Sequence, residues 1–396
     1  MDLAIHERGS PSRRHLRKIA AFTTPDLNRG NRYTLTVKVV LQAAVLALAM
    51  VAALAPVSPA TIERWFSTGL YPVIQHRLTP LANALPFAWL DVLVAAVCVA
   101  VLLVLVRAVR TSRQSRRLAP VLRAVASLAT TAAAVYLVFL LLWGFNYRRV
   151  PMSERLLVEP GAPAADAVLA LGTEAASQLN ALHADAHRIG WVQPLDDQSL
   201  RQAFVDVQRM LVDAPAATPG RLKATLFGPY FRWTGVDGMI NPFGLEVLSN
   251  PDLLDFERPF IAAHEWAHLA GYADESEASF VGWLTCMHAD VPARYSAWLF
   301  LYWQINGELD AAARARLAQA LGPGARQDIT AIVERLQRGQ RPWLRMAGWR
   351  LYDQYLKANR VEEGVRSYGA VVTLILRARF APGWTPVRRA SNLEPQ

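Results

Sequence analysis

Three long apolar segments dominate the first part of the chain. They run over about residues 39–57, 87–106 and 124–145, and polar side chains interrupt them only rarely. A helix needs about 20 apolar residues to cross the hydrocarbon core of a bilayer, and a helix in the core of a soluble domain shows a polar face that these segments lack. The pattern therefore predicts three transmembrane helices, with the lipid bilayer as a partner of the chain.

From about residue 150 the pattern changes to that of a globular, mostly helical domain. Apolar residues recur at helical spacing. The predicted helices cover 163–188, 197–212, 258–270, 275–289, 293–320, 325–339 and 344–360. Residues 213–256 are rich in Gly, Pro, Asn and aromatic residues, which favours loops and short strands. We predict a mainly α fold, with a three-helix transmembrane region over 39–145 and a domain with minor β structure over 150–396.

The basic residues beside the apolar segments predict the orientation of the chain. The tail over 1–38 holds eight Lys and Arg residues, the loop over 107–123 holds six, and the loop between the first two segments holds Arg64 and Arg77. Cytoplasmic loops carry the excess of Lys and Arg. We therefore predict a protein of the bacterial inner membrane, with a cytoplasmic N-terminal tail and a periplasmic or extracellular C-terminal domain.

Two alternatives to this membrane arrangement are weaker. The first apolar segment could be a signal peptide cleaved near 55–60, but a leader of 38 residues is long for that role. The net charge of +10 could indicate nucleic-acid binding. However, the tail and the loop over 107–123 hold fourteen basic and three acidic residues, which leaves 28 basic and 29 acidic residues elsewhere. The positive charge belongs to the membrane flanks, so we predict no nucleic-acid partner.

A His-Glu-x-x-His motif lies in the predicted helix over 258–270. His264 and His268 are four residues apart, so both imidazoles point to the same side of the helix. Zinc favours such nitrogen ligands and keeps one position open for water in catalytic sites. Glu265 follows the first histidine, where its carboxylate can take a proton from that water as a general base. The motif predicts a Zn²⁺-dependent metallopeptidase that acts on a peptide or protein substrate.

Three acidic residues after the motif compete for the place of third ligand. Asp274 stands six residues after His268, as the third ligand does in metzincins. In glutamate-type zinc peptidases, the ligand Glu precedes an Asn or Asp by four residues. Ser279 fills that position if Glu275 is the ligand, so this resemblance favours Glu275, with Glu277 and Asp274 as alternatives. On one helix Glu275 and Glu277 differ in direction by about 200°, so they do not both face the ion.

Several short segments of the chain occur together with this motif. They are Trp-Gly-Phe-Asn-Tyr-Arg-Arg at 143–149, Asn-Pro-Phe at 241–243, Pro-Phe at 259–260, Gly271, Glu-Ser-Glu-Ala-Ser-Phe at 275–280 and Tyr-Ser at 295–296. In these segments the chain resembles a family of uncharacterised bacterial multi-pass membrane proteins, known mainly as a domain of unknown function with a zincin-like motif. The family more often has an acid in place of Ser276 and Asn in place of Ser279. The resemblance implies three spans, a zincin-like extracytoplasmic domain and a peptidase site, but no particular substrate.

Other residues have less specific patterns. Tyr295 is a candidate donor to the oxyanion that forms during hydrolysis, or an aromatic residue packed in a helix. Glu246 is either a candidate residue of the substrate-binding cleft or a solvated carboxylate in a loop. His183 and His187 repeat the four-residue spacing, but Ala184 stands where a catalytic base would be, which argues against a second metal site.

An alternative function is that of a catalytically silent metal-binding or scaffold protein in the membrane. A structural zinc site does not need a carboxylate beside its first histidine. Glu265 therefore favours the enzyme.

Overall fold

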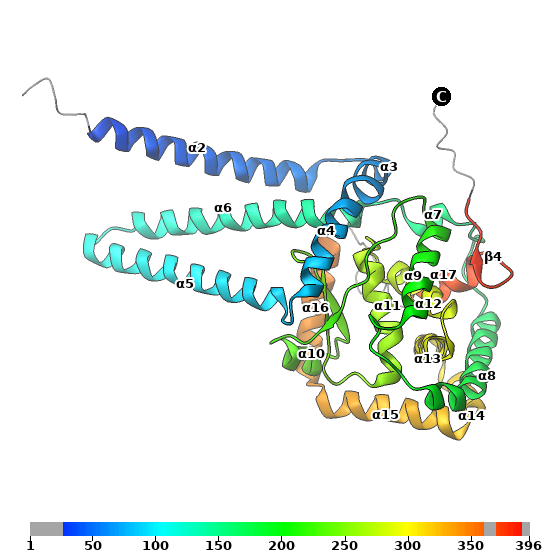
Figure 1. Cartoon of the computed structure of the whole chain (residues 1–396). Helices are drawn as coiled ribbons and strands as arrows, with labels where there is room; N and C mark the ends of the chain where they lie inside the picture. Colours follow the sequence, from blue (N-terminus) through cyan, green and yellow to red (C-terminus); the bar gives the residue numbers. More distant parts are fainter. Residues whose placement is uncertain (1–26, 360–369, 390–396) are drawn as a thin grey trace, which may run out of the picture. The chain divides into compact units, whose positions relative to one another are not determined.

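The computed structural model describes residues 27–359 and 370–389 (Figure 1). This part of the chain is mainly helical and contains short strands, which confirms the predicted fold class at that level. The chain divides into two compact units. The first unit comprises Met1–Ala55 and Val104–Leu137, and the second comprises Pro56–Leu103 and Val138–Gln396.

The first unit contains α2 (Leu27–Leu54), the end of α5 (Trp89–Ser115) and most of α6 (Ala119–Leu142). Three helical stretches, Thr36–Leu54, α5 and α6, are long and apolar enough to cross a membrane, and few of their residues are buried. The three predicted apolar helices are thus confirmed. The predicted cytoplasmic tail falls largely on residues 1–26, outside the described residues, and the orientation of the spans stays a prediction.

The second unit begins with helices where the sequence analysis predicted only a loop between two spans. These are α3 (Pro59–Ile62), the π-helix η1 (Glu63–Leu70) and α4 (Tyr71–Ala84). Two hydroxyl groups of α4 donate hydrogen bonds to distant carbonyl groups: that of Tyr71 to Leu269 at 2.7 Å and that of Thr79 to Leu245 at 2.8 Å. Hydrogen bonds to segments far along the chain hold this region, and a local sequence pattern does not reveal them.

The remaining elements of the second unit include the predicted helices, which agree within a few residues with one exception, and several short helices that the sequence pattern did not predict. They are η2 (Gly144–Arg148), α7 (Met152–Arg155), α8 (Ala165–Ile189), α9 (Gln198–Leu211), β1 (Leu222–Lys223), α10 (Gly228–Thr234), β2 (Gly238–Asn241), β3 (Glu246–Ser249), η3 (Asp255–Glu257), α11 (Arg258–Leu269), α12 (Glu275–Met287), α13 (Val291–Glu308), α14 (Ala311–Ala320), α15 (Pro323–Gly339), α16 (Pro342–Ala358), α17 (Ala370–Arg377), β4 (Phe380–Ala381) and β5 (Thr385–Pro386).

The exception is the helix predicted over 293–320. It is two helices, α13 and α14, because Asp310 begins a new one: its side chain accepts a hydrogen bond from the backbone N–H of Ala313 at 2.8 Å. An aspartate in this position stabilises a helix start by satisfying a free N–H group. The prediction of a single helix was wrong because apolar periodicity continues across the break.

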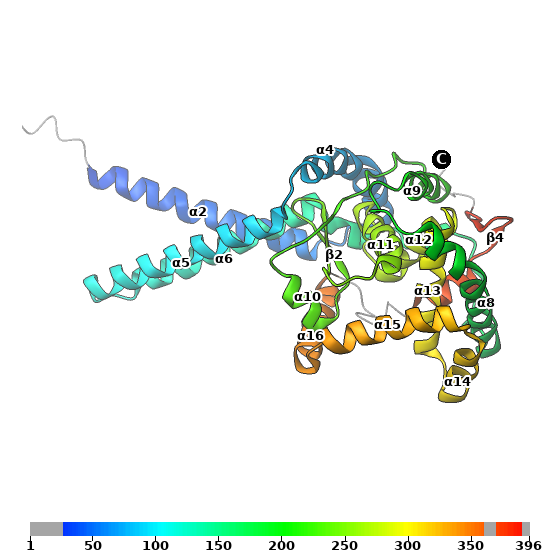
Figure 2. The ribbon, with the colours of Figure 1, turned by 60° about the horizontal axis from the view of Figure 1, so that its bottom comes forward.

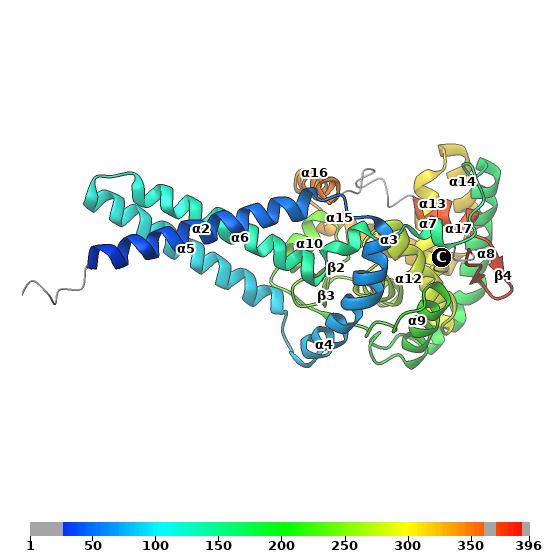
Figure 3. The ribbon, with the colours of Figure 1, turned by 90° about the horizontal axis from the view of Figure 1, so that it is seen from above.

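The core of the second unit surrounds α11 and α12. The buried apolar residues of α9 recur at helical spacing, at 200, 203, 204, 207 and 211, and α9 packs against α12. α13 packs against α8 and α11, and α13 and α8 lie side by side in Figure 3. α15 runs from α8 to α10 and α16 (Figure 2). The histidine motif therefore lies on a helix that is packed from several sides.

A three-stranded sheet lies against α11. Its order is β1-β3-β2, with β1 parallel and β2 antiparallel to β3. Ile240 of β2 pairs with Val247 of β3. β2 is an edge strand of this sheet and contacts α11. The predicted loops and short strands of 213–256 thus supply the strand nearest to the motif.

Candidate metal centre

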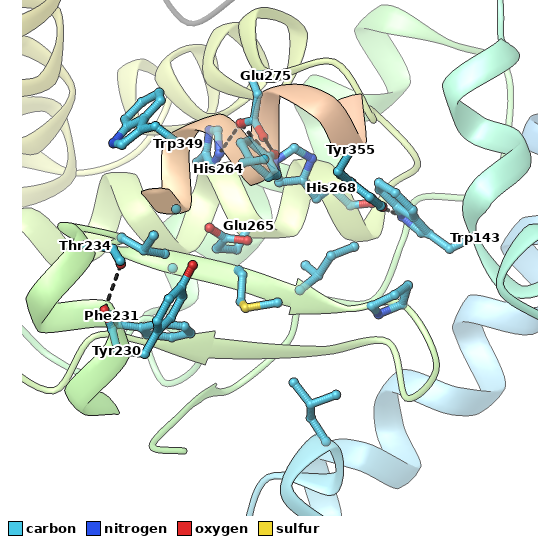
Figure 4. A pocket seen from close by; sticks show the side chains of 18 of the residues that line it. Trp143, Tyr230, Phe231, Thr234, His264, Glu265, His268, Glu275, Trp349 and Tyr355 are labelled. Carbon is cyan, nitrogen blue, oxygen red and sulfur yellow. Dashed lines mark hydrogen bonds and ion pairs between the residues drawn. The ribbon is translucent and has the colours of Figure 1, made fainter. Parts of the chain in front are cut away.

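Two histidines and a glutamate converge beside α11. His264 and His268 lie one turn apart, with ring centroids separated by 4.7 Å. Glu275 begins α12, and its Oε2 lies 3.4 Å from the Nε2 of each histidine. The three potential ligand atoms all lie within 4.8 Å of one another (Figure 4). The structure thus brings together the three residues that the sequence analysis preferred as zinc ligands.

The turn between α11 and α12 directs Glu275 towards the histidines. Gly271 follows α11 with a φ of 83°, a conformation that suits glycine. A Cβ atom at Gly271 would also lie 2.9 Å from Oδ1 of Asn146. Asp274 then caps α12 by accepting hydrogen bonds from two backbone N–H groups of its first turn. The chain reverses within a few residues, so that the first residue of α12 faces α11.

Gly282 allows α12 to approach α11 closely. A Cβ atom at this position would lie 2.8 Å from the backbone nitrogen of His264. The sequence analysis missed this residue. The sequence does contain a signal for it, because glycine inside a helix costs about 1 kcal/mol relative to alanine. A glycine within a predicted helix therefore indicates a close contact at that position.

Hydrogen bonds outside the cluster orient its members. Nδ1 of His268 lies 2.7 Å from the carbonyl oxygen of Tyr272, which only accepts, so Nδ1 carries a proton and, in the neutral ring, Nε2 presents its lone pair. Nδ1 of His264 lies 3.2 Å from Oγ of Ser279. The hydroxyl of Tyr352 donates to Oε1 of Glu275. Such partners hold metal ligands in place and tune their basicity.

Burial and mutual attraction determine the charges in the cluster. Burial raises the pKa of Glu275, but the two histidines outweigh this effect and hold that pKa well below its ordinary value. Burial lowers the pKa of His268, whereas the Glu275 carboxylate raises it, to about 9. Burial lowers the pKa of His264. Among the described residues, the buried Oε2 of Glu275 has no hydrogen-bond partner and faces only the two histidines, at 3.4 Å, so this ionised oxygen retains the capacity to bind a cation.

Glu265 lies between α11 and β2. Its carboxylate approaches Gly238, where an added Cβ atom would lie 2.6 Å from Oε1, so the glycine leaves room for the acid. Burial, helped by the charge of Glu275, raises the pKa of Glu265 to about 8. Its Oε2 has no hydrogen-bond partner within the described part of the chain. A carboxyl group with a pKa near neutrality is suited both to accept and to release a proton.

Two cavities meet at His264 and Glu265. The larger has a volume of about 480 Å³ and also contains His268 and Glu275 in its wall, and the smaller has a volume of about 370 Å³. Gly238 of the edge strand β2 lines both. The wall of the larger cavity is mostly apolar. Its aromatic residues include Trp143, Tyr147, Tyr230, Phe231, Phe243 and Tyr355 (Figure 4). The cluster therefore lies where a ligand can reach it.

Comparison with known protein families gives one match. Residues 66–376 match the model of a family described as proteins of unknown function (DUF3810). The chain belongs to this family. No curated protein and no solved structure matches the chain significantly.

In this DUF3810 protein the alternative third ligands have other partners. Oε1 of Glu277 accepts a hydrogen bond from the backbone N–H of Met152 at 2.5 Å, and Oε2 lies 3.7 Å from Arg155. Asp274 caps α12. Of the three acids, Glu275 alone joins the histidines in the cluster of potential ligands. Its role as a metal ligand stays a prediction.

Two further residues from the sequence analysis lie in other surroundings. The hydroxyl of Tyr295 donates to Asp328, and Tyr295 lines neither of the two cavities, so the geometry gives no support to its predicted role as an oxyanion donor. Glu246 is neither solvated nor in the cleft. It is fully buried and accepts a hydrogen bond from Lys223 at 3.0 Å and others from the first backbone N–H groups of α5.

The sequence analysis also missed two aromatic residues that contact the cluster from distant segments. Tyr352 of α16 donates to Glu275, and the indole N–H of Trp143 donates to the carbonyl oxygen of His268 at 3.0 Å. Trp143 belongs to the segment over 143–149, which carries the family resemblance but has no predicted role in the site. The spacing of Trp143 and Tyr352 along the chain does not predict that they lie near the motif.

Proposed function

We propose that this protein is a membrane-anchored, zinc-dependent metallopeptidase that hydrolyses peptide bonds near the membrane surface. The observation that carries the proposal is the convergence of Nε2 of His264, Nε2 of His268 and Oε2 of Glu275, at 3.4 Å between the carboxylate oxygen and each nitrogen. Two imidazoles and one carboxylate are the ligand set of several catalytic zinc sites.

The residues present fit such an ion. In the neutral imidazole of His268, the nitrogen that faces the cluster presents a lone pair, because the other nitrogen gives its proton to a carbonyl oxygen. An ion that binds there takes the place of the proton on that nitrogen. The facing oxygen of Glu275 is ionised and buried, and it lies 3.4 Å from both histidines. When bound at a site of this kind, zinc lowers the pKa of a bound water and polarises a carbonyl group.

Glu265 is the proposed general base. Its carboxylate lines both cavities beside His264, where it can take the proton of an attacking water and pass it to the departing amine. Burial raises the pKa of Glu265, so that this carboxyl group holds a proton more firmly than an exposed one, which suits it to carry the proton from the water to the amine.

The walls of the site favour an extended peptide with an apolar side chain next to the cleaved bond. β2 is at the edge of its sheet, and Gly238, Met239 and Ile240 line the larger cavity, so a peptide can add to this strand through backbone hydrogen bonds. The apolar, aromatic wall then accepts one side chain. Leu90, in the first turn of the candidate span α5, lines the same cavity, which supports a substrate close to the bilayer.

A quenched-fluorescence peptide library tests this function on the purified full-length protein in detergent. We expect cleavage beside apolar residues, inhibition by a zinc chelator and recovery on addition of zinc. Glu265→Gln should retain the metal and lose cleavage, whereas His264→Ala should lose both. Cleavage by Glu265→Gln at the wild-type rate would disprove the proposal.

The predicted orientation belongs to the same proposal and has its own test. A phosphatase reporter that is active only outside the cytoplasm, fused after Gln396 in bacterial cells, should be active, and one fused near Ser112 should be inactive. The opposite pattern would place the site in the cytoplasm and contradict this part of the proposal.

A further inference from the structure

A second pair of histidines has a carboxylate partner on another helix. His183 and His187 lie one turn apart on α8, with ring centroids separated by 4.2 Å. Oδ2 of Asp328, on α15, lies 2.8 Å from Nε2 of His187 and 3.6 Å from Nε2 of His183. The potential ligand atoms of these three residues all lie within 4.8 Å of one another.

The carboxylate of Asp328 is buried and is held from a third helix. Asp328 is 5% exposed, and its Oδ2 accepts a hydrogen bond from the hydroxyl of Tyr295, on α13, at 2.5 Å. Among the described residues, the ion pairs of Asp328 are with the two histidines and not with a Lys or Arg. A buried carboxylate is costly unless a cation accompanies it.

The two imidazole rings lie close to each other and to the same carboxylate oxygen. Two charged imidazoles at this separation would repel each other. A neutral imidazole presents a lone pair, so the cluster combines two nitrogen donors with one negative oxygen, the donor set that zinc and similar divalent ions prefer.

The surrounding chain holds this arrangement in place. The side-chain amide of Asn180, on α8, accepts from the N–H of Gly322 at 2.6 Å and donates to the carbonyl oxygen of Ala320 at 2.9 Å, which fixes the start of α15 against α8. A Cβ atom at Gly324 would lie 2.4 Å from His183, so glycine allows the close approach. Trp191 packs edge-on against His187 at 4.8 Å.

We propose that His183, His187 and Asp328 form a second site for a divalent transition metal such as zinc, with Tyr295 as a residue that positions Asp328. The site links α8 to α15 and has a structural role. Ala184 stands where a base would be, and none of the cluster residues lines the two cavities at His264. A structural zinc site needs ligands but no base, so the absence of a base does not argue against binding.

Cobalt binding tests this site independently of any peptidase activity. The full-length protein in detergent, stripped of metal, is titrated with Co²⁺ and followed by its visible absorption. We expect two equivalents for the wild type and one for His183→Ala/His187→Ala. His264→Ala/His268→Ala should also bind one equivalent, at the second site. No change in the number or affinity of cobalt ions on replacing His183 and His187 would overturn the proposal.

More conservative substitutions distinguish the loss of a metal ligand from misfolding. Asp328→Asn keeps the size of the side chain, and Tyr295→Phe removes one hydroxyl. In the His264→Ala/His268→Ala background we expect Asp328→Asn to abolish the cobalt bands at one equivalent. Tyr295→Phe should weaken binding by about 10- to 100-fold, as the loss of an outer partner does. Both should keep the wild-type circular dichroism spectrum. Unchanged cobalt affinity in folded Asp328→Asn would also overturn the proposal.

A thermal shift adds a readout specific to the structural role. Zinc should raise the melting temperature of the His264→Ala/His268→Ala protein, because an ion that binds only the folded state stabilises it. The rise should disappear when Asp328→Asn is added. A zinc-dependent rise that survives Asp328→Asn would contradict the assignment. If peptide hydrolysis is absent but both cobalt equivalents are present, the proposed peptidase fails and this proposal stands.

Discussion

The two histidine pairs have the same spacing but different surroundings. In each, Nε2 atoms one turn apart face a carboxylate oxygen from another helix. The side chains of His264 and His268 are 12% and 10% exposed and line a cavity, whereas those of His183 and His187 are 26% and 36% exposed. Glu265 follows the first histidine of one pair, and Ala184 follows that of the other.

This comparison shows what the spacing alone specifies. Two histidines four residues apart on a helix place two nitrogens on one side, and in both pairs another helix brings an acid to that side. Catalysis needs two further features, a carboxylate beside the ion and a cavity for substrate. The pair at α11 has both, so the comparison predicts activity at one pair and stability at the other.

The largest expected effect is the loss of hydrolysis in Glu265→Gln. A general base contributes about 10²- to 10⁴-fold to a rate, and the amide does not accept the proton. We expect a fall of this size in kcat/KM with unchanged metal content, measured on a peptide identified from the library. The control is Glu174→Gln, an exposed residue of α8, which should keep wild-type activity. A fall in both variants would mean that the assay reports folding and not catalysis.

The next effect distinguishes the three acids at the start of α12. Glu275→Ala should weaken zinc binding at α11 by more than about 100-fold, beyond the range of an outer partner. Glu277→Ala should lower the melting temperature, since it leaves the buried N–H of Met152 without its acceptor and removes one of the two carboxylates beside Arg155. Asp274→Ala removes a helix cap worth about 0.5–2 kcal/mol. Zinc titration of all three in the His183→Ala/His187→Ala background separates these effects, and a greater loss for Glu277 or Asp274 would contradict the assignment of Glu275.

Substitution of two glycines distinguishes the two histidine pairs in a further way. Gly282→Ala places a Cβ atom 2.8 Å from the backbone nitrogen of His264, where no side chain can yield. We expect α12 to shift, zinc affinity at α11 to fall, and stability to decrease by about 1–3 kcal/mol, as in other overpacked cores. Gly324→Ala meets the movable ring of His183 instead, so it should weaken cobalt binding at α8 with a smaller change in melting temperature. Cobalt titration in the two backgrounds that each keep one histidine pair should show that Gly282→Ala weakens binding only at α11 and Gly324→Ala only at α8. Weaker binding at the other pair in either variant would contradict this prediction.

The features of the fold and of the site that the sequence predicts are those that depend on residues close together along the chain. The apolar segments, α11 and the pair at His264 follow from local patterns, since burial and helix periodicity act within a few residues. Glu275 was preferred over Glu277 from a family pattern. In the structure its direction depends on the turn at Gly271 and on the contact at Gly282.

Residues that act across long separations could not be predicted in this way. Tyr352 reaches Glu275 from α16, and Asp328 reaches the pair on α8 from α15. The sequence argued against a metal site at His183 and His187, because Ala184 stands in the place of a base and Asp328 lies on a distant helix. Glu246 carries a charge that usually indicates exposure, yet it is buried with Lys223. Each outcome depends on packing that brings distant segments together.

The smallest expected effect concerns Ser279, the position at which glutamate-type zinc peptidases usually carry Asn or Asp. Its Oγ lies 3.2 Å from Nδ1 of His264, a longer contact than the 2.7 Å from Nδ1 of His268 to its carbonyl partner. Ser279→Ala should therefore weaken zinc binding at α11 by only about 10-fold, the lower limit for an outer partner. Ser276→Ala is a matched control, because that hydroxyl donates to Asp274 and not to a histidine. Ser279→Asp should strengthen binding, since a carboxylate beside Nδ1 makes the imidazole a better donor. Zinc competition with a chromophoric chelator in the His183→Ala/His187→Ala background measures all three, and equal affinities for Ser279→Ala and wild type would show that the serine does not orient His264.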